Sequence, residues 1–171
     1  INSFLQNRTF NIQIGNIESD TGYMDNGIPQ GSVLSCTLFN IVFDDVLNNI
    51  DQHTKFCAYA DDLVLFRNGK DTKSTEANLQ KTLNETSTQM NKNGLEISID
   101  KTKIMHFTKQ LKKNVKIPHI KLNNQNIEHV DNYKFLGVIF NNKLKWTEQI
   151  NQLHSKTTKN INLIKMLSHT K

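Results

Sequence analysis

The sequence predicts an α+β domain in which helices pack on one face of an antiparallel sheet. Two observations carry this prediction. Short apolar stretches bounded by glycine and asparagine are typical of strands, and longer stretches with apolar residues at helical spacing lie between them. The 171 residues are 36% hydrophobic, which is enough for one domain with a real core or for a piece of a larger one.

Periodicity predicts the elements of the first part of the chain. In order, they are the end of a helix (1–8), a half-buried strand (10–17), a helix (33–50), a hairpin (55–69) and a helix (71–94). Ser32 is the expected N-cap of the second of these helices, and Gly94 is the expected C-cap of the third. The inner stripe of that third helix is expected at Leu79, Leu83 and Met90.

The second part of the chain is expected to contain further strands and one closing helix. A strand is predicted on each side of a turn at Asp100-Lys101, and residues 109–118 are predicted to form a basic loop. Residues 119–130 and 131–142 have the composition of strands. The stretch 143–169 is expected to be an amphipathic helical region.

Charge is distributed unevenly along the chain. Residues 1–100 hold 7 basic and 13 acidic side chains, whereas residues 101–171 hold 14 basic and 3 acidic ones. A local excess of +11 would attract a polyanion such as nucleic acid by releasing its counterions. A solvated lysine-rich surface is the alternative interpretation. Lysine suits loose phosphate contact better than bidentate recognition of bases.

Cysteine and histidine usage argues for an intracellular protein without a zinc site. Cys36 and Cys57 lie in apolar stretches without a CxxC pattern, so both are expected to be reduced, buried thiols. The six histidines have no zinc spacing. No apolar stretch approaches the roughly 20 residues of a membrane helix, and no signal peptide is recognised. Nucleus and cytoplasm both stay open.

Asp61 and Asp62 separate the apolar stretches FCAYA and LVLF, so both arms of the predicted hairpin are expected to be largely buried. Two like charges at the end of a rigid apolar hairpin repel each other unless a cation binds them. Oxygen ligands suit magnesium, which keeps several waters and shares substrate phosphates. The pair Asp44-Asp45, in the middle of a predicted helix, is interpreted as surface charge.

Four motifs resemble those of reverse transcriptases in their order and spacing. The first is GIPQGSVLS (27–35), which is followed by Leu38-Phe39-Asn40, and the second is the YxDD-like box Tyr59-Ala60-Asp61-Asp62. The next box is resembled by Gly94-Leu95, Ile97 and Lys101-Thr102-Lys103. The YLG box is resembled by Tyr133, Phe135-Leu136-Gly137-Val138, Leu144 and Trp146. The sequences of these motifs are most similar to those of reverse transcriptases of non-long-terminal-repeat (LINE-like) retrotransposons, and the resemblance extends over nearly the whole chain.

This resemblance implies a palm-type antiparallel sheet at residues 1–140 and the start of a helical thumb at residues 141–171. The full enzyme would perform RNA-templated DNA synthesis by two-metal nucleotidyl transfer to a primer 3′-hydroxyl. Its cofactor would be Mg²⁺, or Mn²⁺ in its place. Its partners would be an RNA template, a DNA primer, deoxynucleoside triphosphates, and the fingers and first palm box of the polymerase.

Residue roles also follow from the resemblance. Asp61 would be the main metal ligand of its box, and Asp62 would assist at the same site or orient it. The competing interpretation of the pair is an ordinary structural turn. Pro29, Gln30 and Gly31 would form the floor under the nascent base pair, with glycine allowing a close backbone approach and Gln30 offering an amide.

Other assignments have competing interpretations. Tyr59 would lie near the primer end, or it is an ordinary aromatic of a sheet face. Lys101 would protonate the departing pyrophosphate, with Lys103 as the competing choice and a solvated turn lysine as the structural alternative. Phe135, Leu136 and Gly137 would grip the primer by backbone contacts, a role compatible with a core hairpin.

The chain departs from the family pattern in two ways. Cys36 stands where the family has proline, which should loosen the start of the helix without affecting chemistry. The first metal-binding box is expected before Ile1, so the fragment alone is expected to be inactive. Two alternatives remain, namely a truncated retroelement remnant that at most binds nucleic acid, and a group II intron maturase.

Overall fold

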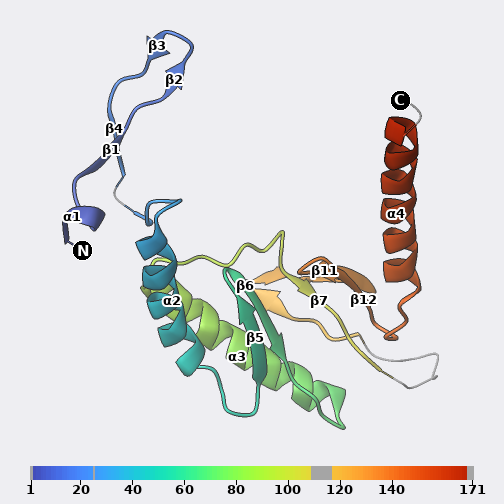
Figure 1. Ribbon diagram of the computed structural model, residues 1–171. Helices are drawn as coiled ribbons and strands as arrows, with labels where there is room; N and C mark the ends of the chain where they lie inside the picture. Colours follow the sequence, from blue (N-terminus) through green and yellow to red (C-terminus); the bar gives the residue numbers. More distant parts are fainter. Residues whose placement is uncertain (1, 25, 109–116, 169–171) are drawn as a thin grey trace. The chain divides into compact units, whose positions relative to one another are not determined.

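Helices and short paired strands alternate in the computed structural model, which describes residues 2–24, 26–108 and 117–168. The elements, labelled in Figure 1, are α1 (Asn2–Leu5), β1 (Arg8–Phe10), β2 (Gln13–Ile14), β3 (Ile17–Glu18), β4 (Gly22–Met24), α2 (Val33–Asn48), β5 (Lys55–Tyr59), β6 (Asp62–Phe66), α3 (Thr72–Lys92), β7 (Lys103–Ile104), β8 (Lys121–Leu122), β9 (Gln125–Asn126), β10 (Glu128–His129), β11 (Asn132–Phe135), β12 (Val138–Asn141) and α4 (Thr147–Ser168).

The chain divides into two units. One comprises the residues up to Leu65 together with Asn84–Glu96, and the other comprises Phe66–Leu83 together with the described residues from Ile97 onward. Helix α3 therefore contributes its C-terminal part to the first unit and its N-terminal part to the second.

The predicted α+β class is confirmed, but the described strands do not form one antiparallel sheet. They form six two-stranded sheets, of which the pair β7–β10 is parallel. Most pairs join strands that are neighbours in sequence, because tight turns return the chain at once. The predicted basic loop lies mostly at residues 109–116, outside the described residues.

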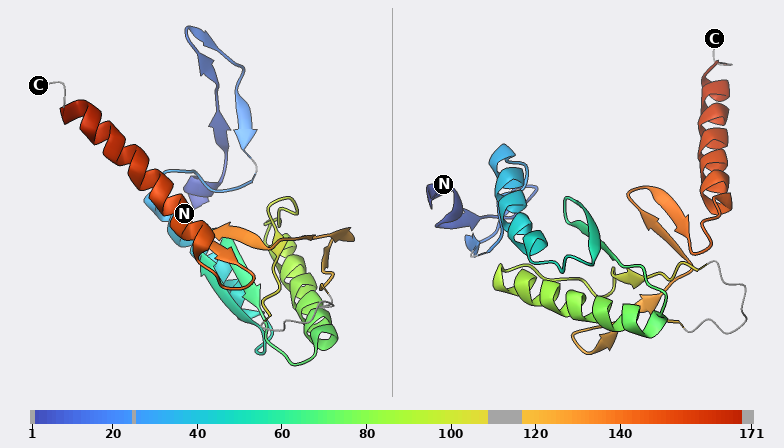
Figure 2. Two further views of the ribbon diagram at one scale, coloured as in Figure 1. Left: turned by 90° about the vertical axis from the view of Figure 1, so that its right-hand side faces the viewer. Right: turned by 90° about the horizontal axis from the view of Figure 1, so that it is seen from below.

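An extended hairpin precedes α2 in the first unit, as Figures 1 and 2 show. Strand β1 pairs with β4 in antiparallel register, and β2 pairs with β3 around a turn at Gly15. The prediction of one half-buried strand over 10–17 is therefore wrong. Alternating polarity was present, but the left-handed Gly15 reverses the chain, and Ile14 and Ile17 are 76% and 77% exposed.

Helix α2 confirms the helix predicted over residues 33–50. Ser32 occupies the N-cap position with extended backbone angles, although its side chain makes no capping hydrogen bond. Phe39 and Phe43 stack with ring centroids 5.4 Å apart, and Val46 is completely buried. The start of the helix is intact at Val33, three residues before Cys36.

Polar side chains fasten α2 to α3 within the first unit. Gln89 and Asn93 donate side-chain hydrogen bonds to Asp45 Oδ2 at 3.0 and 3.3 Å. Asp45 is exposed, as expected for surface charge, and it is in addition an interhelical acceptor. Asp44 is exposed and accepts a hydrogen bond from Asn48 at 2.9 Å.

Strands β5 and β6 form the predicted hairpin, but their arms are not largely buried. Phe56 and Phe66 are 43% and 47% exposed, and Leu63–Leu65 are half-buried. The apolar residues specify strands, whereas burial also requires a covering layer, and no third strand pairs with this hairpin among the described residues. Cys57 on β5 and Cys36 on α2 are free and exposed, so their predicted burial is wrong.

In the second unit, the N-terminal part of α3 packs on the hairpin β8–β9. Leu83, Ile120, Leu122 and Ile127 are buried. The Gln80 side chain donates to the backbone oxygen of Lys121 and accepts from its nitrogen, both at 2.7 Å. The stretch 119–130 is therefore not the single predicted strand, because Asn123 and Asn124 both adopt positive φ and turn the chain.

Helix α3 ends before Gly94, as predicted, and its buried face extends beyond the expected apolar stripe. Leu83 and Met90 are buried and Leu79 is half-buried, but Thr82, Thr86 and Ser87 are also buried. In the stretch 95–108 after α3, only β7 is a strand, so the strand predicted before the Asp100-Lys101 turn is not formed.

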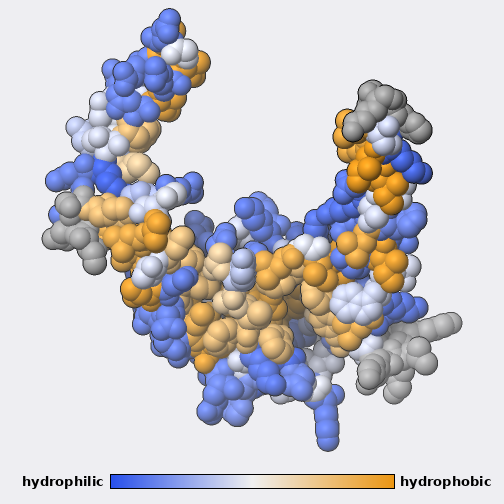
Figure 3. All heavy atoms as spheres, in the orientation of Figure 1, coloured by the Kyte–Doolittle hydropathy of each residue, from blue (hydrophilic) through white to orange (hydrophobic). Residues whose placement is uncertain are grey.

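The stretch 131–142 is the hairpin β11–β12 and not the single predicted strand, because Leu136 and Gly137 adopt positive φ and turn the chain. Helix α4 follows this hairpin and confirms the closing helix. The Gln149 side chain accepts a hydrogen bond from the Ile139 backbone at 2.8 Å, and the rings of Phe140 and Trp146 lie 5.9 Å apart. No residue of α4 is buried, and Figure 3 shows apolar side chains at its surface. None of the described helices is long and apolar enough to cross a membrane.

Two valines of α2 offer a matched test of this packing. Val46 is fully buried and Val33 is 90% exposed. Val46→Ala should lower the free energy of unfolding by about 2 kcal/mol, because two buried methyl groups are lost and a cavity is left. Val33→Ala should change it by less than about 0.5 kcal/mol. Urea unfolding of both variants measures the difference, and equal effects would contradict this core.

Candidate polymerase site

The Asp61-Asp62 pair lies at the tip of the hairpin β5–β6. Tyr59 ends β5, Ala60 and Asp61 form the turn, and Asp62 begins β6. Ala60 has a φ of 50°, in the left-handed region that a residue with a Cβ rarely adopts. Backbone strain of this kind is concentrated at functional sites, where the rest of the structure enforces it. The turn therefore holds the carboxylates at a fixed place on the hairpin.

Both carboxylates are available to a ligand. Asp61 and Asp62 are exposed, and neither has a hydrogen-bond or ion-pair partner among the described residues. Two adjacent carboxylates without donors fit a hard cation, which compensates their repulsion. Within the described part of the chain, no group of three or more His, Cys, Asp or Glu side chains could hold a metal. The pair thus fits a metal that takes its remaining ligands from water, phosphates or another segment.

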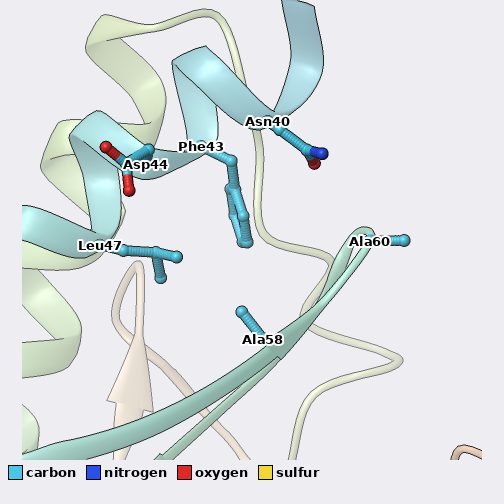
Figure 4. A pocket seen from close by; sticks show the side chains of 6 residues that line it. All are labelled: Asn40, Phe43, Asp44, Leu47, Ala58 and Ala60. Atoms are coloured by element: carbon cyan, nitrogen blue, oxygen red, sulfur yellow. The ribbon is translucent and has the colours of Figure 1, made fainter. Parts of the chain in front are cut away.

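A shallow pocket of about 240 Å³ lies between α2 and this hairpin. Figure 4 shows Phe43 on α2 and Ala58 on β5 pointing toward one another across it. Asn40, Asp44, Leu47 and Ala60 complete the lining. The small side chain of Ala58 leaves this space beside the carboxylate turn open, whereas that of Ala60 points away from it.

The loop with Pro29, Gln30 and Gly31 leads into α2. Gln30 is exposed and has no partner among the described residues, so its amide is free to bind a ligand. Gly31 has a φ of 86°, and a Cβ there would meet no atom within 4 Å. The left-handed backbone conformation therefore favours glycine at this position. The open space beside it agrees with the expected close approach of a nucleotide or template to the backbone.

The structure separates the two competing lysines in the second unit. Lys103 Nζ forms an ion pair with Glu128 at 2.5 Å, and its side chain is 22% exposed. Lys101 is exposed, and its side chain has no partner among the described residues. The Tyr133 hydroxyl donates to the Lys101 backbone oxygen at 3.2 Å, which joins the Lys101 turn to β11. Lys101 is thus the lysine with a free ammonium group.

The tip of the hairpin β11–β12 carries Phe135, Leu136 and Gly137. Phe135 pairs with Val138, and the two turn residues between them have φ values of 47° and 85°. Two positive values define a type I′ turn, whose twist matches the flanking strands. Leu136 is 49% exposed. A strained, exposed turn therefore stands where the sequence predicts the primer grip.

Comparison with known proteins now identifies the family. Residues 1–140 match the family described as "Reverse transcriptase (RNA-dependent DNA polymerase)". The chain belongs to the reverse transcriptase family. The resemblance to enzymes of LINE-like retrotransposons is confirmed by its relatives.

These relatives are polymerases of mobile elements. The RNA-directed DNA polymerase from mobile element jockey of Drosophila melanogaster is 26% identical over 90% of this chain, and that of Drosophila funebris is 29% identical over 93%. The Pol polyprotein from type-1 retrotransposable element R2 of Nasonia vitripennis is 32% identical over 67% of the chain. The chain spans only 17%, 18% and 12% of these relatives' lengths.

The structure places Asp61, Asp62 and Tyr59 on one hairpin, and Lys101 beside Tyr133 in the other unit. Tyr59 is 66% exposed, which leaves its two interpretations open. Sequence reasoning missed the side-chain bonds that hold the site's loops, above all those of Arg8 and Ser35. A signal for Arg8 was present, since it is one of only two arginines in a lysine-rich chain.

Paired glycine substitutions test the strain of the carboxylate turn. At Ala60, glycine relieves the left-handed conformation, which offsets the extra backbone entropy that glycine loses on folding. At Ala58, which has no positive φ, only the entropy loss remains. Ala60→Gly should therefore be about 1 kcal/mol more stable than Ala58→Gly in thermal or urea unfolding. A lower stability of Ala60→Gly would refute the strained turn.

Proposed function

We propose that this chain is the catalytic segment of a retrotransposon reverse transcriptase that copies RNA into DNA. In the whole polymerase, Asp61 and Asp62 bind divalent metal and residues 1–140 form part of a palm. Residues 141–171 begin a thumb. One observation carries the proposal. Two unpartnered carboxylates lie on a strained turn, within a segment that matches the reverse transcriptase family.

The carboxylates supply the negative charge that the reaction requires. Asp61 is the principal ligand and Asp62 assists at the same site. Together they would hold Mg²⁺, or Mn²⁺ in its place, which would supply activation of the primer 3′-hydroxyl and stabilisation of the leaving pyrophosphate. The remaining ligands would come from water, nucleotide phosphates and a carboxylate elsewhere in the polymerase. This segment alone should therefore yield no primer extension.

Other residues position the substrates. The exposed Gln30 amide, on the loop with Pro29 and Gly31, contacts the nascent base pair. Phe135–Gly137 hold the primer through the backbone of their turn. Lys101 gives a proton to pyrophosphate, since the competing Lys103 is engaged with Glu128. The template is RNA, the primer is DNA, and the substrates are deoxynucleoside triphosphates.

Exposed free thiols at Cys36 and Cys57 agree with a reducing, intracellular location. The alternative function is that of an inactive retroelement remnant that at most binds nucleic acid. The charge asymmetry alone supports that alternative, whereas the unpartnered Asp61 and Gln30 support an active parent enzyme.

Removing one charge at the carboxylate turn tests the catalytic proposal. In the polymerase that contains this segment, Asp61→Asn should reduce primer extension on poly(rA)/oligo(dT) by several orders of magnitude. Metal stabilisation of transition-state charge is worth several kcal/mol, and each ~1.4 kcal/mol is tenfold. Thermal stability should not fall, because a repulsion is removed.

The matched control is Asp20→Asn, on an exposed stretch of the first unit. It should extend primers at the normal rate. Normal extension by Asp61→Asn, together with an early melting transition, would make Asp61 a structural turn residue.

Nucleic-acid binding should be electrostatic and reside in residues 101–171. Replacement of Lys143, Lys145, Lys156 and Lys159 by glutamine should weaken RNA–DNA duplex binding. The slope of log affinity against log salt concentration should also become less steep, by about 1 for each phosphate that a lysine no longer neutralises. The same change at four exposed lysines of the acidic part, Lys55, Lys70, Lys73 and Lys92, should have less effect. Equal losses in both quadruple variants would contradict this assignment.

A further inference from the structure

Arg8 connects the start of the extended hairpin to the loop that carries Gln30. Its Nη2 atom donates hydrogen bonds to the backbone oxygens of Asn26 and Gly27, at 3.1 and 2.7 Å. These residues lie 18 and 19 positions away in sequence. A single guanidinium nitrogen that bridges two consecutive carbonyls fixes the orientation of both peptide planes. Arg8 therefore determines how the chain leaves the hairpin and enters the loop.

Ser35 holds the same loop from its other end. Its hydroxyl donates to the Pro29 backbone oxygen at 2.5 Å, and the residue is only 6% exposed in the first two turns of α2. The carbonyls of residues 26, 27 and 29 are thus held by two side chains from two different elements. Gln30 follows directly and is exposed.

The environment of Arg8 indicates more than a contribution to folding. Its Nε and Nη1 atoms are buried and have no hydrogen-bond partner among the described residues. Buried donors without partners lower stability, so a residue selected only for stability would not leave them so. Sites where local stability is sacrificed are characteristically functional.

We propose that Arg8 and Ser35 are positioning residues for Gln30. They hold the loop from both sides, so that the Gln30 amide is presented to the incoming nucleotide in one orientation. This inference rests on the proposed polymerase function and assigns the support on which its nucleotide-binding loop depends. Arg8 touches no substrate, and its effect passes through the loop backbone.

The anchoring itself is tested on the chain without any substrate. Arg8→Gln removes the charge and the forked donors, while Arg8→Lys keeps the charge and one donor group. Hydrogen exchange at the amides of residues 26–32 should accelerate in Arg8→Gln, less in Arg8→Lys, and not in the neighbouring Thr9→Val. Exchange in the buried part of α3, residues 82–90, should stay unchanged. Unchanged exchange at 26–32 in Arg8→Gln would overturn the anchor.

The functional role is tested in the polymerase that contains this segment. Arg8→Gln and Ser35→Ala should raise the KM for deoxynucleotides about tenfold and lower kcat much less, since nucleotide placement is affected and the metal ligands are not. Thr9→Val and Thr37→Ala, exposed neighbours of the two residues, are the matched controls. If Arg8→Gln lowers both kcat and the melting temperature while the KM stays unchanged, Arg8 has only a structural role.

A double-mutant cycle decides whether Arg8 acts through Gln30. In the Gln30→Ala background, Arg8→Gln should raise the KM by less than about twofold, because the side chain that Arg8 positions is already absent. A full tenfold effect in both backgrounds would overturn the proposal. Failure of the polymerase proposal has a different signature, since Asp61→Asn would then extend primers normally whatever the Arg8 variants do.

Discussion

The turn that places Asp61 and Asp62 at the tip of the hairpin β5–β6 is the constraint on which the site depends. The two side chains are neighbours in sequence at a hairpin tip, exposed, and without a protein donor among the described residues. Two exposed carboxylates without protein donors agree with the metal site that we propose. The hairpin and the left-handed turn at Ala60 position this pair, and a shallow pocket lies beside the turn.

Both hairpin tips assigned to the reaction are strained in the same way. Ala60 and Leu136 have φ values of 50° and 47°. Glycine and asparagine adopt this left-handed conformation at a lower energetic cost. Asn123 and Asn124 form a turn of the same kind with residues that tolerate it. Alanine and leucine, which rarely adopt left-handed angles, therefore occupy these positions at the two assigned tips. Leu144, which has no assigned role, also has a positive φ of 54°. The strain at the two tips agrees with the proposed chemistry without being confined to these sites.

Helices and hairpin tips could be predicted from the sequence because their signals are local. The spacing of apolar residues gave α2, α3 and α4, and the flanking apolar stretches gave the Asp61-Asp62 turn. Burial could not be predicted in the same way. Cys57 and Phe56 lie in an apolar strand, yet they are exposed because only two strands form that sheet.

Residues that act through a distant partner also escaped prediction. The bonds of Arg8 to Gly27, Tyr133 to Lys101 and Lys103 to Glu128 join positions 19, 32 and 25 residues apart. No periodicity in a single sequence encodes such pairs. The proposed site residues depend instead on the order of four motifs, and the ion pair of Lys103 with Glu128 favours Lys101 in the proposed role.

Paramagnetic broadening by Mn²⁺ tests the metal-binding claim most directly. A bound ion at the carboxylate turn would broaden the backbone amide signals of residues 59–63 in the NMR spectrum of this chain, and excess Mg²⁺ would restore them. The broadening should vanish in the double variant Asp61→Asn, Asp62→Asn and persist in Asp44→Asn. Broadening centred on other carboxylates, or unchanged in the double variant, would contradict a metal site at this turn.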